Sequence, residues 1–174
     1  MNSLSFPIPT RSLSELSLFL YLPPMKATAS LLLQLINQHL SALNNISEED
    51  YAAKPAPNKW SKKEILGHLI DSAQSNIRRF VMAQYEENPF IKYNQDQWVA
   101  INNYQQWETK DIIGLWYGLN KQVCNILNNT PAAMYQRTCQ TENLQTIEWL
   151  AADYIKHLQH HLHVVLGLEP VAYS

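Results

Sequence analysis

Apolar residues recur at intervals of three and four over long stretches of this chain, which is the period of an amphipathic helix. The clearest run covers residues 27–44, and residues 61–84, 109–129 and 146–166 follow the same pattern. Glycine occurs only four times, and alternation of apolar and polar residues is scarce. Strands need both turn residues and alternation, so the sequence predicts four long helices and an all-α fold.

Local signals mark several ends of these helices. Ser61 and Glu64 have the spacing of a capping box, in which each side chain satisfies a free amide of the other residue's backbone. Thr109 is the predicted cap of the third helix, whose expected inward face includes Leu115. Gly167 stands where a helix commonly ends in a left-handed residue.

The segments between the predicted helices differ in character. Pro55 and Pro57 enforce a loop after the first helix. Residues 88–108 are rich in amides and are predicted to form a long loop with one helical turn, although their aromatic residues favour packing over disorder. Four helices with two long connections are typical of a four-helix bundle.

Size, charge and cysteine content narrow the class of protein. The 174 residues fit one domain, which can bury a core without disulfides or a structural metal. A net charge of −2 gives no basic surface for nucleic acid. Cys124 and Cys139 form neither a CxxC motif nor a disulfide framework, which favours reduced thiols in the cytoplasm. No apolar run is long enough to span a membrane.

The first residues stand apart from the helical pattern. We predict a disordered extension over residues 1–24, a bundle over 25–168 and a short tail over 169–174. Leu18–Leu22 weakly resembles the apolar part of a signal peptide, but Glu15 precedes it and no small-residue cleavage site follows it. Translation that starts at Met25 is the other interpretation left open.

The fourth predicted helix carries four histidines in seven positions. His157 and His161 are one helical turn apart and share the apolar arc, so their rings can converge on one ion. His160 and His163 are predicted to project into solvent. A single inward histidine is usually a satisfied core residue, whereas a shared metal offsets the cost of burying two imidazoles.

The second predicted helix has a polar stripe at the edge of its apolar arc. His68 and Arg79 stand at its ends, and the small residues Ser72 and Ser75 lie between them. Small side chains leave room for a ligand beside an ion bound to His68, and Arg79 could hold an anionic group of that ligand. An ordinary solvated helix face is the alternative.

Three segments in this order resemble the DinB-like superfamily of helical bundles (the DinB/YfiT type). They are the segment from Trp60 to Asp71, the segment from Tyr93 to Val99 with its Asp96 and Trp98, and the histidine motif from His157 to Leu162. The resemblance covers roughly residues 26–168 and implies an up-down-down-up four-helix bundle. One position departs from the pattern, because Val164 stands where relatives often carry glutamine.

The resemblance also implies a divalent metal, zinc or nickel, held by one histidine of the second helix and two of the fourth. These map onto His68, His157 and His161. Relatives are often homodimers, and characterised ones use thiols such as bacillithiol, mycothiol or glutathione in transferase and isomerase reactions.

We therefore expect a metal-dependent thiol S-transferase or hydrolase that acts on a small molecule. An ion held by three neutral imidazoles lowers the pKa of a bound water or thiol. Asp71 and Asp153 are candidates to orient the ligands or to move protons, and Arg79 and Asn76 are candidates for substrate binding. Two alternatives stay open, a non-catalytic metal-binding bundle that acts through dimerisation and a bundle without metal.

Overall fold

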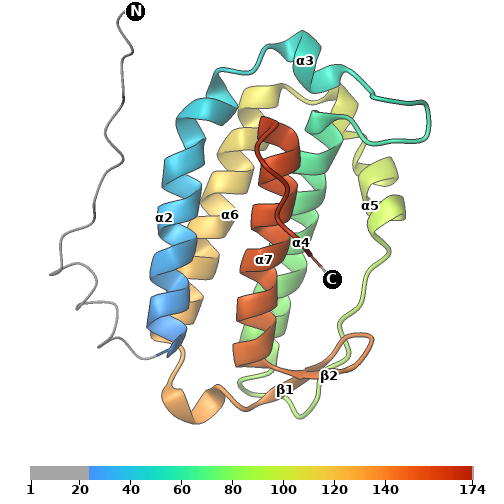
Figure 1. Cartoon of the computed structure of the whole chain (residues 1–174). Helices are drawn as coiled ribbons and strands as arrows, with labels where there is room; N and C mark the ends of the chain where they lie inside the picture. Colours follow the sequence, from blue (N-terminus) through green and yellow to red (C-terminus); the bar gives the residue numbers. More distant parts are fainter. Residues whose placement is uncertain (1–23, 174) are drawn as a thin grey trace, which may run out of the picture.

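Four long helices form the body of the protein in the computed structural model, which describes residues 24–173. They are α2 (Pro24–Asn44), α4 (Lys62–Met82), α6 (Thr109–Asn129) and α7 (Ile147–Leu166). Figure 1 shows α2 and α7 running in one direction and α4 and α6 in the other. The predicted all-α bundle with up-down-down-up order is confirmed. The predicted extension at residues 1–24, with its two alternatives, lies almost entirely outside the described residues.

The order of packing around the bundle makes α4 and α7 neighbours. Helix α2 packs against α6 and α7, and α4 packs against the same two helices. The core between them contains Trp116 of α6, Phe80 of α4 and Tyr154 of α7, all of which are buried. Leu115 was predicted to face this core but is exposed, because it lies at the margin of its helix's apolar arc.

Capping explains where the helices begin and end. The capping box of Ser61 and Glu64 is present at the start of α4, as predicted. Gly167 ends α7 with φ +65°, also as predicted. The prediction for Thr109 is wrong, since Glu108 is the N-cap residue of α6 and makes no capping bond. The Thr109 hydroxyl instead donates to Glu48 of the short helix α3 (Glu48–Ala52).

The connection between α4 and α6 is more ordered than a loop with one helical turn. It contains α5 (Gln95–Asn102) and a 3-10 turn, η1 (Tyr104–Gln106). Tyr104 is buried and its ring lies against Gly67 of α4. A Cβ atom at Gly67 would stand 2.1 Å from that ring, so α4 needs glycine here for the connection to pack against it.

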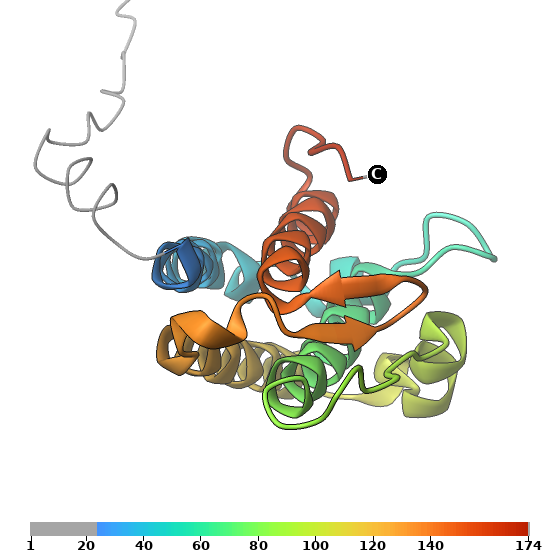
Figure 2. The ribbon, with the colours of Figure 1, turned by 90° about the horizontal axis from the view of Figure 1, so that it is seen from below.

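A small hairpin, which the helical pattern did not predict, joins α6 to α7. After a 3-10 turn, η2 (Ala132–Met134), strand β1 (Thr138–Gln140) pairs antiparallel with β2 (Leu144–Thr146). Gln140 also forms a bridge with Phe90, which follows α4. Figure 2 shows the hairpin lying across one end of the bundle.

After Gly167 the chain turns and runs back along α7 (Figure 1). The segment was predicted to be a short tail. In the part of the chain that the structure describes, no helix is long and apolar enough to cross a membrane.

Candidate metal centre

Helices α4 and α7 bring three histidine rings together. His68 is buried on α4, and His157 and His161 lie one turn apart and half-buried on α7. One ring nitrogen of each residue lies within 4.8 Å of those of the other two. The Nε2 atoms of His68 and His157 are 3.0 Å apart. This is the predicted trio, and both the helical phase on α7 and the antiparallel packing of α4 against α7 produce it.

The arrangement fits a divalent cation. Two imidazole nitrogens bound to one tetrahedral zinc ion lie about 3.3 Å apart, given zinc–nitrogen distances near 2.05 Å. The Nε2 atoms of His68 and His157 already approach this separation. Each of the two rings directs its Nε2 atom at the other. One proton or one cation must therefore lie between these atoms, because two lone pairs would repel each other.

The electrostatics of the cluster keep the three rings neutral. Burial, with a smaller contribution from the neighbouring His161, lowers the pKa of His68 to about 3. Burial also lowers the pKa of His157 to about 2 and that of His161 to about 4, with smaller contributions from nearby histidines. A neutral imidazole has a free lone pair at neutral pH, which is the form that binds a metal.

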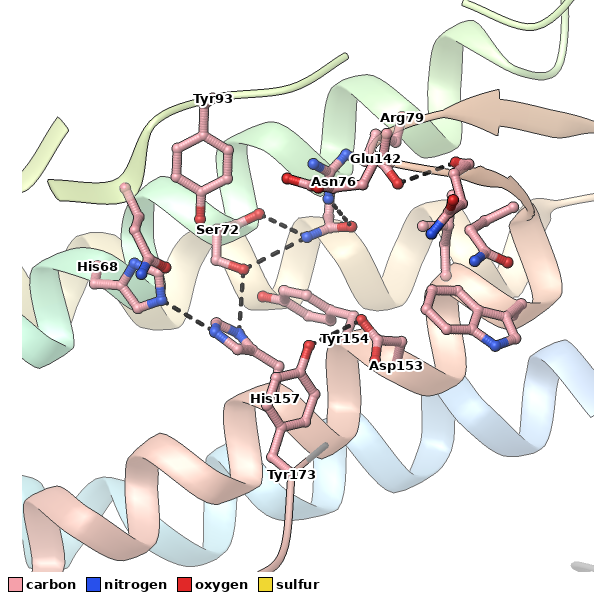
Figure 3. Close-up of a pocket in the computed structure, with 16 residues that line it drawn as sticks. His68, Ser72, Asn76, Arg79, Tyr93, Glu142, Asp153, Tyr154, His157 and Tyr173 are labelled. Carbon is pink, nitrogen blue, oxygen red and sulfur yellow. Dashed lines mark hydrogen bonds between the residues drawn. The ribbon is translucent and has the colours of Figure 1, made fainter. Parts of the chain in front are cut away.

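A chain of hydrogen bonds along α4 supports the ring of His157. Its Nδ1 lies 3.4 Å from Ser72 Oγ, on the opposite side of the ring from Nε2. Asn76 Nδ2 donates to the backbone oxygen and the hydroxyl of Ser72, at 2.9 and 3.4 Å. Arg79 in turn donates to Asn76 Oδ1 at 3.3 Å and to the Ile91 carbonyl. Ser72 and Arg79 of the predicted polar stripe are thus joined through Asn76 (Figure 3).

This network forms one wall of a cavity of about 400 Å³. His68, His157, Ser72, Asn76 and Arg79 line it from α4 and α7. Other lining residues include Tyr93 before α5, Glu142 in the hairpin and Tyr173 after α7, together with Asp153 on α7. In Figure 3 the labelled side chains of Tyr93 and Tyr173 approach the histidines from opposite sides.

A second, more apolar cavity of about 580 Å³ reaches the cluster from the side of His161. Trp60, Ile65 and Val164 contribute its apolar surface, and the Trp60 ring lies 5.1 Å from that of His68. Gln95 lines both cavities. The three histidines therefore stand between a polar cavity and an apolar one.

The two aspartates that were predicted to orient the metal ligands or to move protons lie in different places. Asp153 lines the polar cavity, where its carboxylate accepts a hydrogen bond from Tyr173 at 3.1 Å. Asp71 lies elsewhere, fully buried, and accepts hydrogen bonds from Tyr104 and Asn102 at 2.6 and 3.1 Å. None of its hydrogen bonds among residues 24–173 goes to a histidine of the cluster. Its position is that of an anchor for the connection between α4 and α6.

The remaining histidines of α7 are not simply solvated, which corrects the prediction for His160 and His163. Both are half-buried, and their Nδ1 atoms contact the carbonyls of Val171 and Glu169 at 2.7 and 2.6 Å. Sequence reasoning also missed Tyr173 as a cavity residue. Helical phase gave no signal for these contacts, because they depend on the path of the chain after Gly167.

Comparisons of sequence place the chain among known proteins. A family model described as the DinB superfamily matches residues 31–165. A protein of Halalkalibacterium halodurans, provisionally named a metal-dependent hydrolase, is 29% identical over 108 residues, which are 60% of this chain and 63% of that protein. A protein of Oceanobacillus iheyensis with the same provisional name is 27% identical over 112 residues, 63% of this chain and 64% of that one. The matches span less than two thirds of these curated relatives.

Two solved structures share the fold of this chain. YfiT from Bacillus subtilis, described as a "probable metal-dependent hydrolase with an unusual four-helix bundle topology", matches with a TM-score of 0.58 at 16% identity, over 95% of each chain. A mycothiol-dependent maleylpyruvate isomerase matches with a TM-score of 0.62 at 14% identity, over 88% of this chain and 64% of the other.

Proposed function

This chain belongs to the DinB superfamily, and from that premise we propose that it is a metal-dependent enzyme whose ion is held by His68, His157 and His161. The observation that carries the proposal is the convergence of the three ring nitrogens within 4.8 Å at the edge of a polar cavity. The names of the two bacterial relatives support a metal-dependent reaction. Zinc and nickel are the candidate ions.

The donor set favours catalysis over a purely structural role. Structural zinc sites are normally closed by four protein ligands, whereas catalytic sites keep a position open. Among the described residues, the cluster contains three candidate ligands and no fourth histidine, cysteine or carboxylate. A divalent ion with open positions supplies positive charge that lowers the pKa of a bound water or low-molecular-weight thiol. The proposed reactions are accordingly hydrolysis or thiol S-transfer on a small molecule.

The chain's own residues would prepare and orient the reactants. When His157 carries its proton on Nδ1, that N–H would donate to Ser72 Oγ, and the Nε2 lone pair would face the other two rings. Arg79 and Asn76 present donors to the cavity for an anionic or carbonyl group of the substrate. Two carboxylates line the cavity, and Asp153 is the one we propose as proton acceptor, because Glu142 is paired with Lys92. We also propose that the protein is a homodimer, as many relatives are.

A metal analysis tests the proposal directly. Purified wild-type protein, dialysed against zinc or nickel, should retain one ion per chain, and His68→Ala, His157→Ala and His161→Ala should each lose most of it. Lys156→Ala is the control, since that residue is exposed on α7 outside the cluster, and it should keep the ion. Retention of the ion by all three cluster variants would contradict the proposal.

Activity then separates the possible functions. Ester or amide hydrolysis without added thiol would identify a hydrolase, and thiol-dependent consumption of electrophiles would identify a transferase. Each activity should be lost in His68→Ala. A protein that binds the ion but shows neither activity would support the alternative, a metal-binding bundle that acts through dimerisation.

A further inference from the structure

The chain after α7 returns along the same helix in an ordered way. We call residues 168–173 the C-terminal strap. The amide of Leu168 donates to the carbonyl of His163 at 2.9 Å, which turns the chain back at the end of α7. Two carbonyls and one side chain then contact α7 at alternate positions, 169, 171 and 173. Alternation by two is what an extended chain gives.

The matching groups on α7 lie on one helical stripe. The Glu169 carbonyl contacts His163 and the Val171 carbonyl contacts His160, three residues earlier on the helix. A carbonyl only accepts hydrogen bonds, so the Nδ1 atom of each histidine must be the donor. These contacts give a role to His160 and His163, the two histidines of α7 outside the cluster. One face of α7 presents His157 and His161 to α4, and the adjacent face holds the strap.

The strap delivers Tyr173 to the polar cavity. The ring of Tyr173 lies 5.3 Å from that of His157, and its hydroxyl donates to Asp153 at 3.1 Å. The Tyr173 side chain lines the cavity on one side, while 40% of the residue's surface remains exposed. Figure 3 shows the side chain standing beside His157, with its hydroxyl directed toward Asp153.

We propose that the C-terminal strap is part of the site and that Tyr173 is a specificity-determining residue, whose ring limits the size of the molecule that reaches His157. The specificity role rests on the proposed function, because it presumes that a reactant enters this cavity. The docking of the strap does not. Asp153 is half-buried in the cavity. The hydrogen bond from the Tyr173 hydroxyl uses one acceptor position of the Asp153 carboxylate and fixes the orientation of that carboxylate.

Docking is tested without metal or substrate by digestion with a carboxypeptidase, with release of Tyr173 followed by mass spectrometry. His163→Ala removes one of the hydrogen bonds to the strap and should speed the release about fivefold, which corresponds to about 1 kcal/mol. Tyr85→Ala, a substitution at an exposed tyrosine beyond the end of α4, should digest at the wild-type rate. Equal rates for wild type and His163→Ala would overturn the docking.

The specificity role is tested by removing zinc from the loaded protein with a small chelator and with a bulky one. In Tyr173→Ala the rate of zinc removal by the bulky chelator should rise several-fold relative to the rate with the small one. Tyr173→Phe keeps the ring and should retain most of the wild-type ratio of the two rates. An unchanged ratio in Tyr173→Ala would overturn the specificity role. If wild-type protein holds no zinc, the proposed function fails and the specificity role with it, while the digestion still decides the docking.

Discussion

Asp71 is a carboxylate that the fold has removed from water. Its side chain is fully buried, Oδ1 accepts from Tyr104 and Asn102, and Oδ2 has no hydrogen-bond partner among residues 24–173. Burial raises the pKa of Asp71 to about 6, although the bond from Tyr104 partly opposes the shift. A carboxyl group with these surroundings is stabilised in its protonated form.

The raised pKa predicts how stability depends on pH. The folded protein binds the proton of Asp71 more tightly than the unfolded chain, whose value is about 3.8. The stabilisation is therefore complete below about pH 4 and is lost as the pH rises through about 6. Asp71→Asn should remove this part of the pH dependence. At pH 8 the variant should gain up to about 3 kcal/mol in free energy of unfolding, at 1.36 kcal/mol for each pKa unit.

Urea unfolding at pH 5 and pH 8 measures the effect. Glu87→Gln, which removes an exposed carboxylate beyond α4, is the control. Its free energy of unfolding should differ between pH 5 and pH 8 by as much as that of the wild type. An Asp71→Asn variant with the same pH dependence as wild type would show that Asp71 is ionised in the folded protein at both pH values.

Sequence reasoning was most successful for residues whose position follows from helical phase. His157 and His161 share a face because they are four residues apart on one helix, and their convergence with His68 needed only the pairing of two helices. Tyr173 could not be found in this way. Its position depends on hydrogen bonds from His160 and His163 to backbone carbonyls, and such contacts leave no trace in the pattern of apolar residues.

The contact between α4 and its following connection depends on one glycine. Gly67→Ala would place a Cβ atom within 2.1–2.5 Å of three atoms of the buried Tyr104 ring. We expect a loss of about 1–3 kcal/mol in free energy of unfolding, since a packed ring must move. Gly118→Ala on α6 is a matched control, because nothing lies within 4 Å of the added atom. It should stabilise the protein by about 0.5–1 kcal/mol.

Thermal or urea unfolding of the two variants provides the comparison. A gain of stability in Gly67→Ala, like the gain expected for Gly118→Ala, would show that Tyr104 does not pack closely on α4.

The elements themselves were predictable to different degrees. The long helices have apolar periodicity over many turns, and the caps at Ser61 and Gly167 fix two of their ends. Strands β1 and β2 contain only three residues each, too few for alternation to be visible. Helix α5 has eight residues, most of them exposed, and begins at the Asn94 cap. Its order depends on contacts with α4, which a local pattern does not contain.

The whole molecule should remain folded without an ion, because its core is apolar and extends between all four helices. Zinc at a thousandfold excess over its dissociation constant would add about 4 kcal/mol of stability. For a chain of this size that raises Tm by about 10 °C. A chelator should reverse the increase and leave the helical circular dichroism intact at 25 °C. His68→Ala should show no zinc-dependent increase in Tm. Loss of the helical signal on chelation would show that the ion is needed for folding.

His68 and His157 are 89 positions apart in the chain. An ion shared between them would act as a cross-link that closes a loop containing α5, α6 and the hairpin. Cross-links that close long loops restrict the unfolded chain strongly. Opening of the bundle between α4 and α7 would then require the ion to leave first, so the lifetime of the folded state would be tied to the rate of metal release.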